Sequence, residues 1–195
     1  MHQVEYNLSL TQTMLENMEP YLLSEEVYWP VASQPDAGSP PFPRLTLGGF
    51  LLTQDELSVQ KATMISRQTS AYKDLQHRYG QITRKWKSAI GRKAIREMNS
   101  RSNLWHAYVE ELEERRKVPY DYPREVRHRV MFERLIDVAG VDAELEKILE
   151  KNLKVDERLL TVSIPSDFLW DADLQTIYIK DRFWFLYRKL FRVRN

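Results

Sequence analysis

The feature that most constrains this chain is a long proline-free stretch between Arg44 and Val118. Within it, apolar residues recur mostly in steps of three and four, at positions 57, 64, 72, 75, 79, 82, 86 and 90. That spacing is typical of one face of an α-helix. Thr53-Gln-Asp-Glu56 fits a capping box, which satisfies free backbone N–H groups at a helix start. We therefore predict one long helix over about 53–98, roughly 68 Å long.

The end of this helix is predicted from polar residues. Asn99-Ser-Arg-Ser-Asn103 is the expected break or kink, because these side chains compete for backbone hydrogen bonds. A second helix would follow, burying Trp105, Tyr108, Val109 and Leu112. Residues 53–117 are thus expected to form a long helix or a kinked helix pair.

The first 52 residues form an acidic segment that is interrupted by prolines. Residues 8–19 fit a short amphipathic helix, which Pro20 should end or kink at Glu19. Residues 35–43 contain four prolines, so they should form an irregular, extended loop.

Residues 121–195 are expected to add further helices. Asp121 or Tyr122 would cap a helix that has Pro123 in its first turn and ends at Gly140 as the C′ residue. A second helix would start at Asp142. Their inward residues are predicted to be Val126, Val130, Leu135 and Ile136 in the first, and Leu145, Ile148, Leu149 and Leu153 in the second.

The C-terminal pattern is less regular. We predict a final helix around Asp181–Phe191. Short strands at Leu159–Ile164 and Thr176–Ile179 are the alternative, ranked below helix or loop. The predicted fold is an all-α antiparallel helical bundle in a single domain, residues 1–195, with one unusually long helix.

Composition narrows the classes of chemistry. The chain has no cysteine, which excludes disulfides, thiolate metal sites and cysteine nucleophiles. Its longest apolar run, Phe183–Tyr187, is much shorter than the ~20 residues of a membrane-spanning helix. The first residues show no secretory signal, so a cytoplasmic protein is expected.

Charge is distributed unevenly along the chain. Residues 1–60 carry a net charge of −7, residues 61–101 carry +9, and the remainder carries −1. On a helical wheel, Arg78, Lys85, Arg92 and Arg96 fall within an arc of about 40°, and Lys93 widens this basic ridge. Such a ridge can follow a phosphate backbone without reading its sequence. The alternatives are a solvated charged face, or docking of the acidic N-terminal segment onto the basic helix.

Metal and catalytic signals are weak. Glu125 and His128 have the Glu-x-x-His spacing of carboxylate-bridged di-iron bundles, and His106 and Glu110 are also one helical turn apart. Only one such motif is present, however, and arginines flank His128 on both sides. We therefore predict no metal and no cofactor, and keep a metal-dependent helical-bundle enzyme as the weakest alternative.

The C-terminal segment is rich in aromatic residues, with eight of the chain's 22 between Phe168 and Phe191. They are predicted to pack in the core or against a partner, with Trp184, Tyr187 and Phe191 as partner-binding candidates. A membrane surface and a small-ligand aromatic pocket are the alternatives. The steps of three and four over 75–90 also resemble a coiled-coil seam, so self-association is a further alternative.

These patterns favour a non-enzymatic helical adaptor or scaffold that binds another protein. A sequence-independent nucleic-acid-binding protein that uses Arg78, Lys85, Arg92, Lys93 and Arg96 is the second hypothesis.

Overall fold

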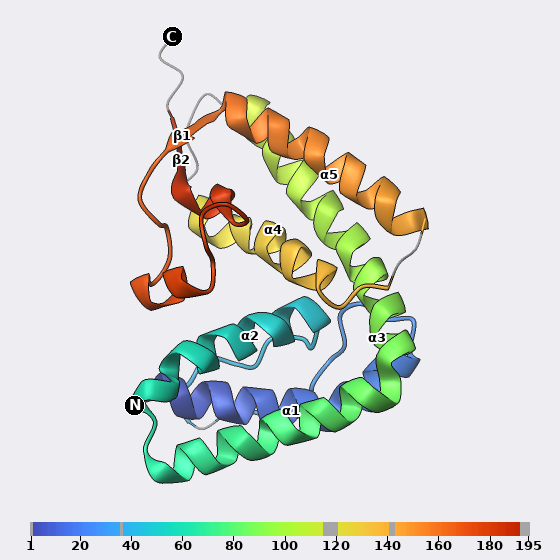
Figure 1. The fold of residues 1–195 in the computed structure, drawn as a ribbon, viewed down its shortest axis with the longest axis vertical. Helices are drawn as coiled ribbons and strands as arrows, with labels where there is room; N and C mark the ends of the chain where they lie inside the picture. Colours follow the sequence, from blue (N-terminus) through green and yellow to red (C-terminus); the bar gives the residue numbers. More distant parts are fainter. Residues whose placement is uncertain (1, 36, 115–120, 141–142, 192–195) are drawn as a thin grey trace. The chain divides into compact units, whose positions relative to one another are not determined.

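The computed structural model describes residues 2–35, 37–114, 121–140 and 143–191. Its α-helices are α1 (His2–Leu23), α2 (Leu47–Gln60), α3 (Ser66–Glu114), α4 (Tyr122–Ile136) and α5 (Ala143–Thr161), shown in Figure 1. Three short 3₁₀ helices and a two-stranded sheet complete the described chain. The predicted all-α bundle with one unusually long helix is confirmed.

The chain divides into two compact units, each described by itself. Unit 1 comprises Met1–Glu97 and Val138–Gly140, and unit 2 comprises Met98–Asp137 and Val141–Asn195. Helix α3 contributes its first part to unit 1 and its last part to unit 2. The single-domain organisation stays a prediction.

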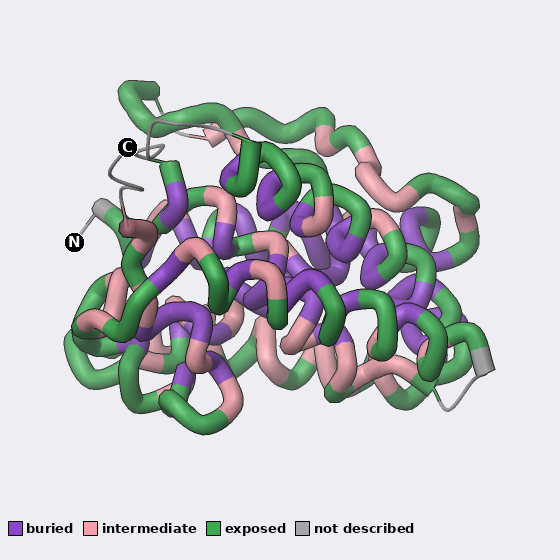
Figure 2. The backbone as a smooth tube through the Cα atoms, turned by 90° about the horizontal axis from the view of Figure 1, so that it is seen from above, coloured by how far each residue is buried: buried purple, intermediate pink, exposed green. Residues whose placement is uncertain are grey.

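Unit 1 is built from α1, α2 and the first part of α3. Helices α1 and α3 run in the same direction, because Glu5 pairs with Arg67 and Glu19 pairs with Lys85 further along both helices. Buried and exposed residues alternate along each helix, as the purple and green segments in Figure 2 show. The core includes Met14, Met18, Tyr21, Phe50, Leu57, Ile90 and Ala94.

Helix α2 begins before the predicted capping box. Its first free amides are satisfied by Thr46 Oγ1 (3.0 Å from Gly49 N), by a Glu97 carboxylate oxygen (3.0 Å from Gly48 N) and by the Tyr21 hydroxyl (3.1 Å from Leu47 N). Thr53 instead lies inside the helix and donates its hydroxyl to the carbonyl of Gly49. The predicted helix start at Thr53 was therefore wrong, because two of these three partners lie far away in the sequence.

The long helix also differs from the predicted range 53–98. The chain leaves α2 at Gln60, passes through a 3₁₀ turn (η1, Lys61–Thr63) and starts again at Ser66. The Gln68 side chain fixes this start by accepting a hydrogen bond from the Ile65 amide, at 3.0 Å. The helix then continues through residues 99–103, where a break was predicted, and its kink lies at Trp86 (φ −117°, ψ 23°).

Helix α1 is longer than expected at both ends and continues through Pro20 to Leu23. Pro20 is exposed, so water can satisfy the carbonyl that the proline leaves without an N–H donor. Burial of Tyr21 and Leu22 in the next turn favours the extra helix. Of the two outcomes predicted for Pro20, a helix end or a kink at Glu19, the helix end was wrong.

Unit 2 packs the last part of α3 with α4 and α5. As predicted, Trp105, Tyr108, Val109 and Leu112 of α3 are buried. Helix α4 begins at Tyr122 with Asp121 as its N-cap and Pro123 in its first turn, which also confirms the prediction. A buried ion pair joins α4 to α5, since Arg129 bonds Asp156.

Three details of α4 and α5 depart from the predictions. Helix α4 ends at Ile136, and Gly140 lies beyond the cap without the positive φ of a C′ glycine. Leu153 was expected to point inward but is 61% exposed. The predicted start at Asp142 lies outside the described residues.

The predicted C-terminal helix over Asp181–Phe191 was wrong. Residues Trp184–Tyr187 form a 3₁₀ helix (η3), and Arg188–Leu190 form strand β2. This strand pairs antiparallel with β1 (Ser163–Pro165), placing Ser163 opposite Leu190. Phe183, Phe185, Leu186 and Tyr187 are all buried, which a one-sided surface α-helix cannot achieve for nearly consecutive residues.

Candidate functional site

The predicted basic ridge lies in unit 1, and its members have different surroundings. Lys93 is 2% exposed, and its ammonium group donates to the carbonyls of Ser24 at 2.7 Å and Glu26 at 2.9 Å. Burial lowers the pKa of Lys93, and the nearby charge of Arg96 acts in the same direction. Lys93 therefore holds the chain after α1 and is inaccessible to a polyanion.

Two further ridge residues are paired with acids of the N-terminal segment. Lys85 Nζ lies 3.2 Å from a Glu19 oxygen, and Arg96 forms an ion pair with Glu25. The acidic segment thus docks onto the basic helix, the intramolecular alternative that the charge distribution suggested. Both pairs are solvent-exposed, and exposed pairs contribute only about 0–1 kcal/mol.

Arg78, Arg84, Lys87 and Arg92 are among the cations of α3 that form no ion pair within the described part of the chain. Arg84, Lys87 and Arg92 are exposed, and Arg78 is half-buried. The structure therefore leaves Arg78 and Arg92 available from the five residues of the predicted ridge.

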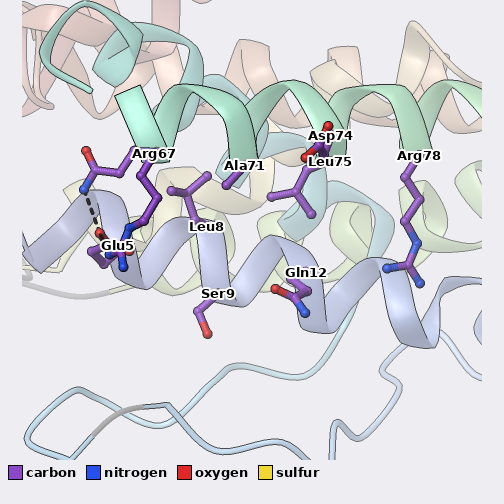
Figure 3. Close-up of a pocket in the computed structure, with 10 residues that line it drawn as sticks. Glu5, Leu8, Ser9, Gln12, Arg67, Ala71, Asp74, Leu75 and Arg78 are labelled. Atoms are coloured by element: carbon purple, nitrogen blue, oxygen red, sulfur yellow. Dashed lines mark hydrogen bonds and ion pairs between the residues drawn. The ribbon is translucent and has the colours of Figure 1, made fainter. Parts of the chain in front are cut away.

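A groove lies between α1 and α3 in unit 1. It has a volume of about 520 Å³. Figure 3 shows Leu8, Ala71 and Leu75 between the two helices, where they form an apolar floor. Ser9 and Gln12 of α1 lie along the rim and are exposed. The sequence indicated only part of this site, since Leu75 belonged to the predicted seam.

Charged side chains lie at both ends of this α1–α3 groove (Figure 3). At one end, Glu5 accepts hydrogen bonds from Arg67 and Gln68, both at 2.9 Å, and these bonds lower the pKa of Glu5. Further along α3 lie Asp74 and Arg78, which form no ion pair with other described residues. The groove therefore combines an apolar floor with one acid and one base available to a ligand.

The residues considered as metal ligands, His106, Glu110, Glu125 and His128, all lie in unit 2. Both histidines are hydrogen-bonded to arginines. An Arg101 nitrogen lies 3.1 Å from His128 Nδ1, and an Arg158 nitrogen lies 2.9 Å from His106 Nε2. Since a guanidinium only donates, these ring nitrogens are acceptors. Burial and the nearby arginines lower the pKa of His128 to about 4.

A metal centre also needs several converging ligands. Glu125 lies 3.6 Å from His128 Nε2, whereas the structure gives no contact between that pair and His106 or Glu110. Within the described residues, no group of three or more His, Asp or Glu side chains is arranged to hold a metal ion.

The C-terminal aromatic residues belong mainly to the interior of unit 2. Tyr187 is 7% exposed and donates its hydroxyl to the Tyr178 carbonyl at 2.9 Å. Trp184 and Phe191 are half-buried, and the Arg188 guanidinium lies 5.8 Å from the Trp184 ring centroid. Of these three partner-binding candidates, Tyr187 is therefore a core residue. It also lines a second groove.

The chain matches no protein-family model, and it shows no significant similarity to a curated protein or to a solved structure. Among the helices that the structure describes, none has the length and apolar character required to cross a membrane.

Proposed function

We propose that this chain is a non-enzymatic helical adaptor, and that the α1–α3 groove binds a segment of another protein. The observation that carries the proposal is the groove between α1 and α3, which is floored by buried Leu8 and by the half-buried Ala71 and Leu75. Apolar hollows that a helix or peptide can fill are a recurring mode of protein recognition.

The charges of the groove indicate the kind of segment that fits. Arg78 and Asp74 have no ion-pair partners among described residues, so a bound segment should supply an acid and a base one helical turn apart. Its apolar side chains would cover the floor at spacings of three and four residues. An amphipathic helix has both properties.

The experiment introduces bulk at the rim without touching the core. Ser9→Arg and Gln12→Arg fill the groove from its exposed edge, whereas Ser70→Arg places the same side chain on an exposed part of α3 that does not line it.

A photo-crosslinking residue at position 12 should capture a partner in cells, and the same residue at position 70 should not. Ser9→Arg should abolish the crosslink. Equal capture at both positions would contradict the proposal.

A second candidate, polyanion binding, is supported by a group of exposed cations on α3, Arg84, Lys87 and Arg92, which form no ion pair with described residues. Binding of labelled single-stranded DNA and RNA across a salt series tests it. If these residues contact phosphates, Arg84→Glu/Lys87→Glu/Arg92→Glu should abolish binding and leave the helical circular dichroism unchanged. A triple variant that still binds would eliminate this candidate.

A further inference from the structure

Unit 2 contains a second groove, which is walled by aromatic side chains. It has a volume of about 430 Å³, and its walls are Phe168, Trp170 and Tyr187. Its polar rim is formed by Ser166, Asp167, Gln175 and Lys180. Phe168 and Trp170 are only half-buried, so their rings remain available to a ligand. We call this site the aromatic groove.

The walls of the aromatic groove are held in place. Trp170 Nε1 donates to the Pro123 carbonyl at 2.8 Å, and the Tyr187 hydroxyl is fixed by its bond to Tyr178. The ring centroids of Phe168 and Tyr187 lie 5.2 Å apart, and the Ser166 amide donates to the Tyr187 carbonyl at 2.9 Å. Because these rings are already ordered, a ligand loses little affinity to ordering them.

Charges on the rim restrict the ligand. Asp167 is exposed, and its carboxylate forms no ion pair with any residue that the structure describes. A free carboxylate beside the rings disfavours a phosphate group. Lys180, whose ammonium lies 5.8 Å from the Tyr187 ring centroid, disfavours a compact cation inside the same aromatic walls. An uncharged segment with a basic residue beyond its end satisfies both constraints.

We infer that the aromatic groove docks a proline-rich segment that carries an arginine or lysine next to its prolines. Such segments adopt the polyproline II conformation before binding, and grooves lined by aromatic rings recognise them. The prolines would lie against Trp170 and Phe168, and the basic residue would pair with Asp167. This inference does not depend on the α1–α3 groove.

The chain itself provides a probe of the required chemistry. Residues 39–44 read Ser-Pro-Pro-Phe-Pro-Arg, and Arg44 is exposed. Proline fixes its own φ and drives the preceding residue into extended geometry, so a peptide of residues 38–46 is predisposed to polyproline II. A fluorescently labelled synthetic peptide of these residues serves as the ligand for the full chain.

The test is a double-mutant cycle measured by fluorescence anisotropy. We expect saturable binding with a Kd below about 1 mM. Asp167→Asn should weaken it about two- to five-fold, the loss expected for an exposed ion pair. The matched variant Asp173→Asn, an exposed aspartate that does not line the groove, should leave the Kd unchanged. Replacing Arg44 by Gln in the peptide should weaken binding to the wild type but not to Asp167→Asn.

Three results would overturn the inference. The first is no saturable binding of the peptide below about 1 mM. The second is an equal Kd for Asp167→Asn and Asp173→Asn. The third is undiminished binding of a peptide in which all three prolines are alanine, because that peptide keeps the arginine but loses the polyproline conformation. A further contradicting result is displacement of the wild-type peptide by a thymidine oligonucleotide at equal concentration. That result would mean that the aromatic rings stack against nucleic-acid bases instead of prolines.

Discussion

The ammonium group of Lys93 lies 2.7 Å from the main-chain carbonyl oxygen of Ser24 inside unit 1. It also lies 4.4 Å from the centroid of the Tyr21 ring. The most basic part of the sequence thus uses one of its charges to hold the turn that follows α1. Cations of α3 therefore have a structural role, because Lys93, Lys85 and Arg96 bind the acidic N-terminal segment.

Removing the Lys93 ammonium group should destabilise the protein. Lys93→Met leaves the carbonyls of Ser24 and Glu26 without their buried donor, so the free energy of unfolding should fall by about 1–3 kcal/mol. Lys87→Met, on the exposed side of α3, should change it by less than about 0.5 kcal/mol. Urea denaturation measures both variants, and equal effects would contradict the structural role of Lys93.

Release of Lys85 should increase polyanion binding. Glu19→Gln removes the carboxylate 3.2 Å from the Lys85 ammonium, so affinity for single-stranded DNA should rise and the slope against salt should steepen by about one charge. Glu16→Gln makes the same change of net charge on α1 without freeing a lysine, because Glu16 bonds Gln12. A similar gain for both variants would mean that net charge alone controls binding.

The buried ion pair of unit 2 should be its most sensitive polar contact. Asp156 accepts from Arg129 Nε at 3.0 Å and from Trp105 Nε1 at 3.1 Å. Asp156→Asn leaves the buried charge of Arg129 with Glu133, at 2.8 Å, as its remaining ion-pair partner, so we expect a loss of about 1–3 kcal/mol in the free energy of unfolding. Glu150→Gln, which breaks an exposed pair with Lys154, should leave the free energy of unfolding nearly unchanged. Thermal and urea unfolding of the two variants would show the contrast.

His128 should make stability depend on pH. Its pKa in the folded protein is about 4 against an ordinary value of 6.5, and Arg101 and Glu125 face its ring. Between these pH values the unfolded chain binds more protons, so stability should fall by up to about 3 kcal/mol as pH drops from 6.5 to 4. His128→Gln should make the free energy of unfolding less dependent on pH in this range, whereas His77→Gln, at an exposed site, should leave that dependence as in the wild type. An unchanged pH profile for His128→Gln would contradict the assignment.

Two glycines of α3 should respond oppositely to alanine. A Cβ at Gly91 would lie 3.1 Å from the backbone nitrogen of Gly140, so Gly91→Ala should strain that contact and lower the melting temperature. At Gly80 the nearest atom, in the Arg84 side chain, is 3.9 Å away. Gly80→Ala should therefore gain helix propensity, about 0.5–1 kcal/mol. A stabilised Gly91→Ala variant would show that Gly140 can move away at little cost.

The helices and much of the core follow from local patterns. The apolar stripe of Val126, Val130 and Leu135, together with Pro123 in the first turn of α4, predicts that helix from neighbouring residues alone. The acidic and basic blocks likewise suggested that the N-terminal segment docks onto α3. These predictions succeeded because helical spacing and charge are properties of short stretches of sequence.

Helix boundaries and grooves depended on distant partners. Helix α2 starts at Leu47 with Thr46 as a local N-cap, but two of its first amides are bonded by Glu97 and Tyr21, which lie far away in the sequence. The C-terminal residues leave the α-helical path because Phe185 and Tyr187 are both buried and because β2 pairs with β1. No local pattern contains that information.

By itself, the sequence therefore determined an all-α chain with one long helix and an internal attraction between its acidic and basic segments. Only the tertiary structure decided which charged groups are buried and hydrogen-bonded inside the protein, as Lys93 is. It also decided which form no ion pair with described residues, as is the case for Arg78 and Asp167. Periodicity reports which face of a helix is apolar. The free energy of a buried charge or of an open groove depends on atoms brought together from distant positions, which only folding specifies.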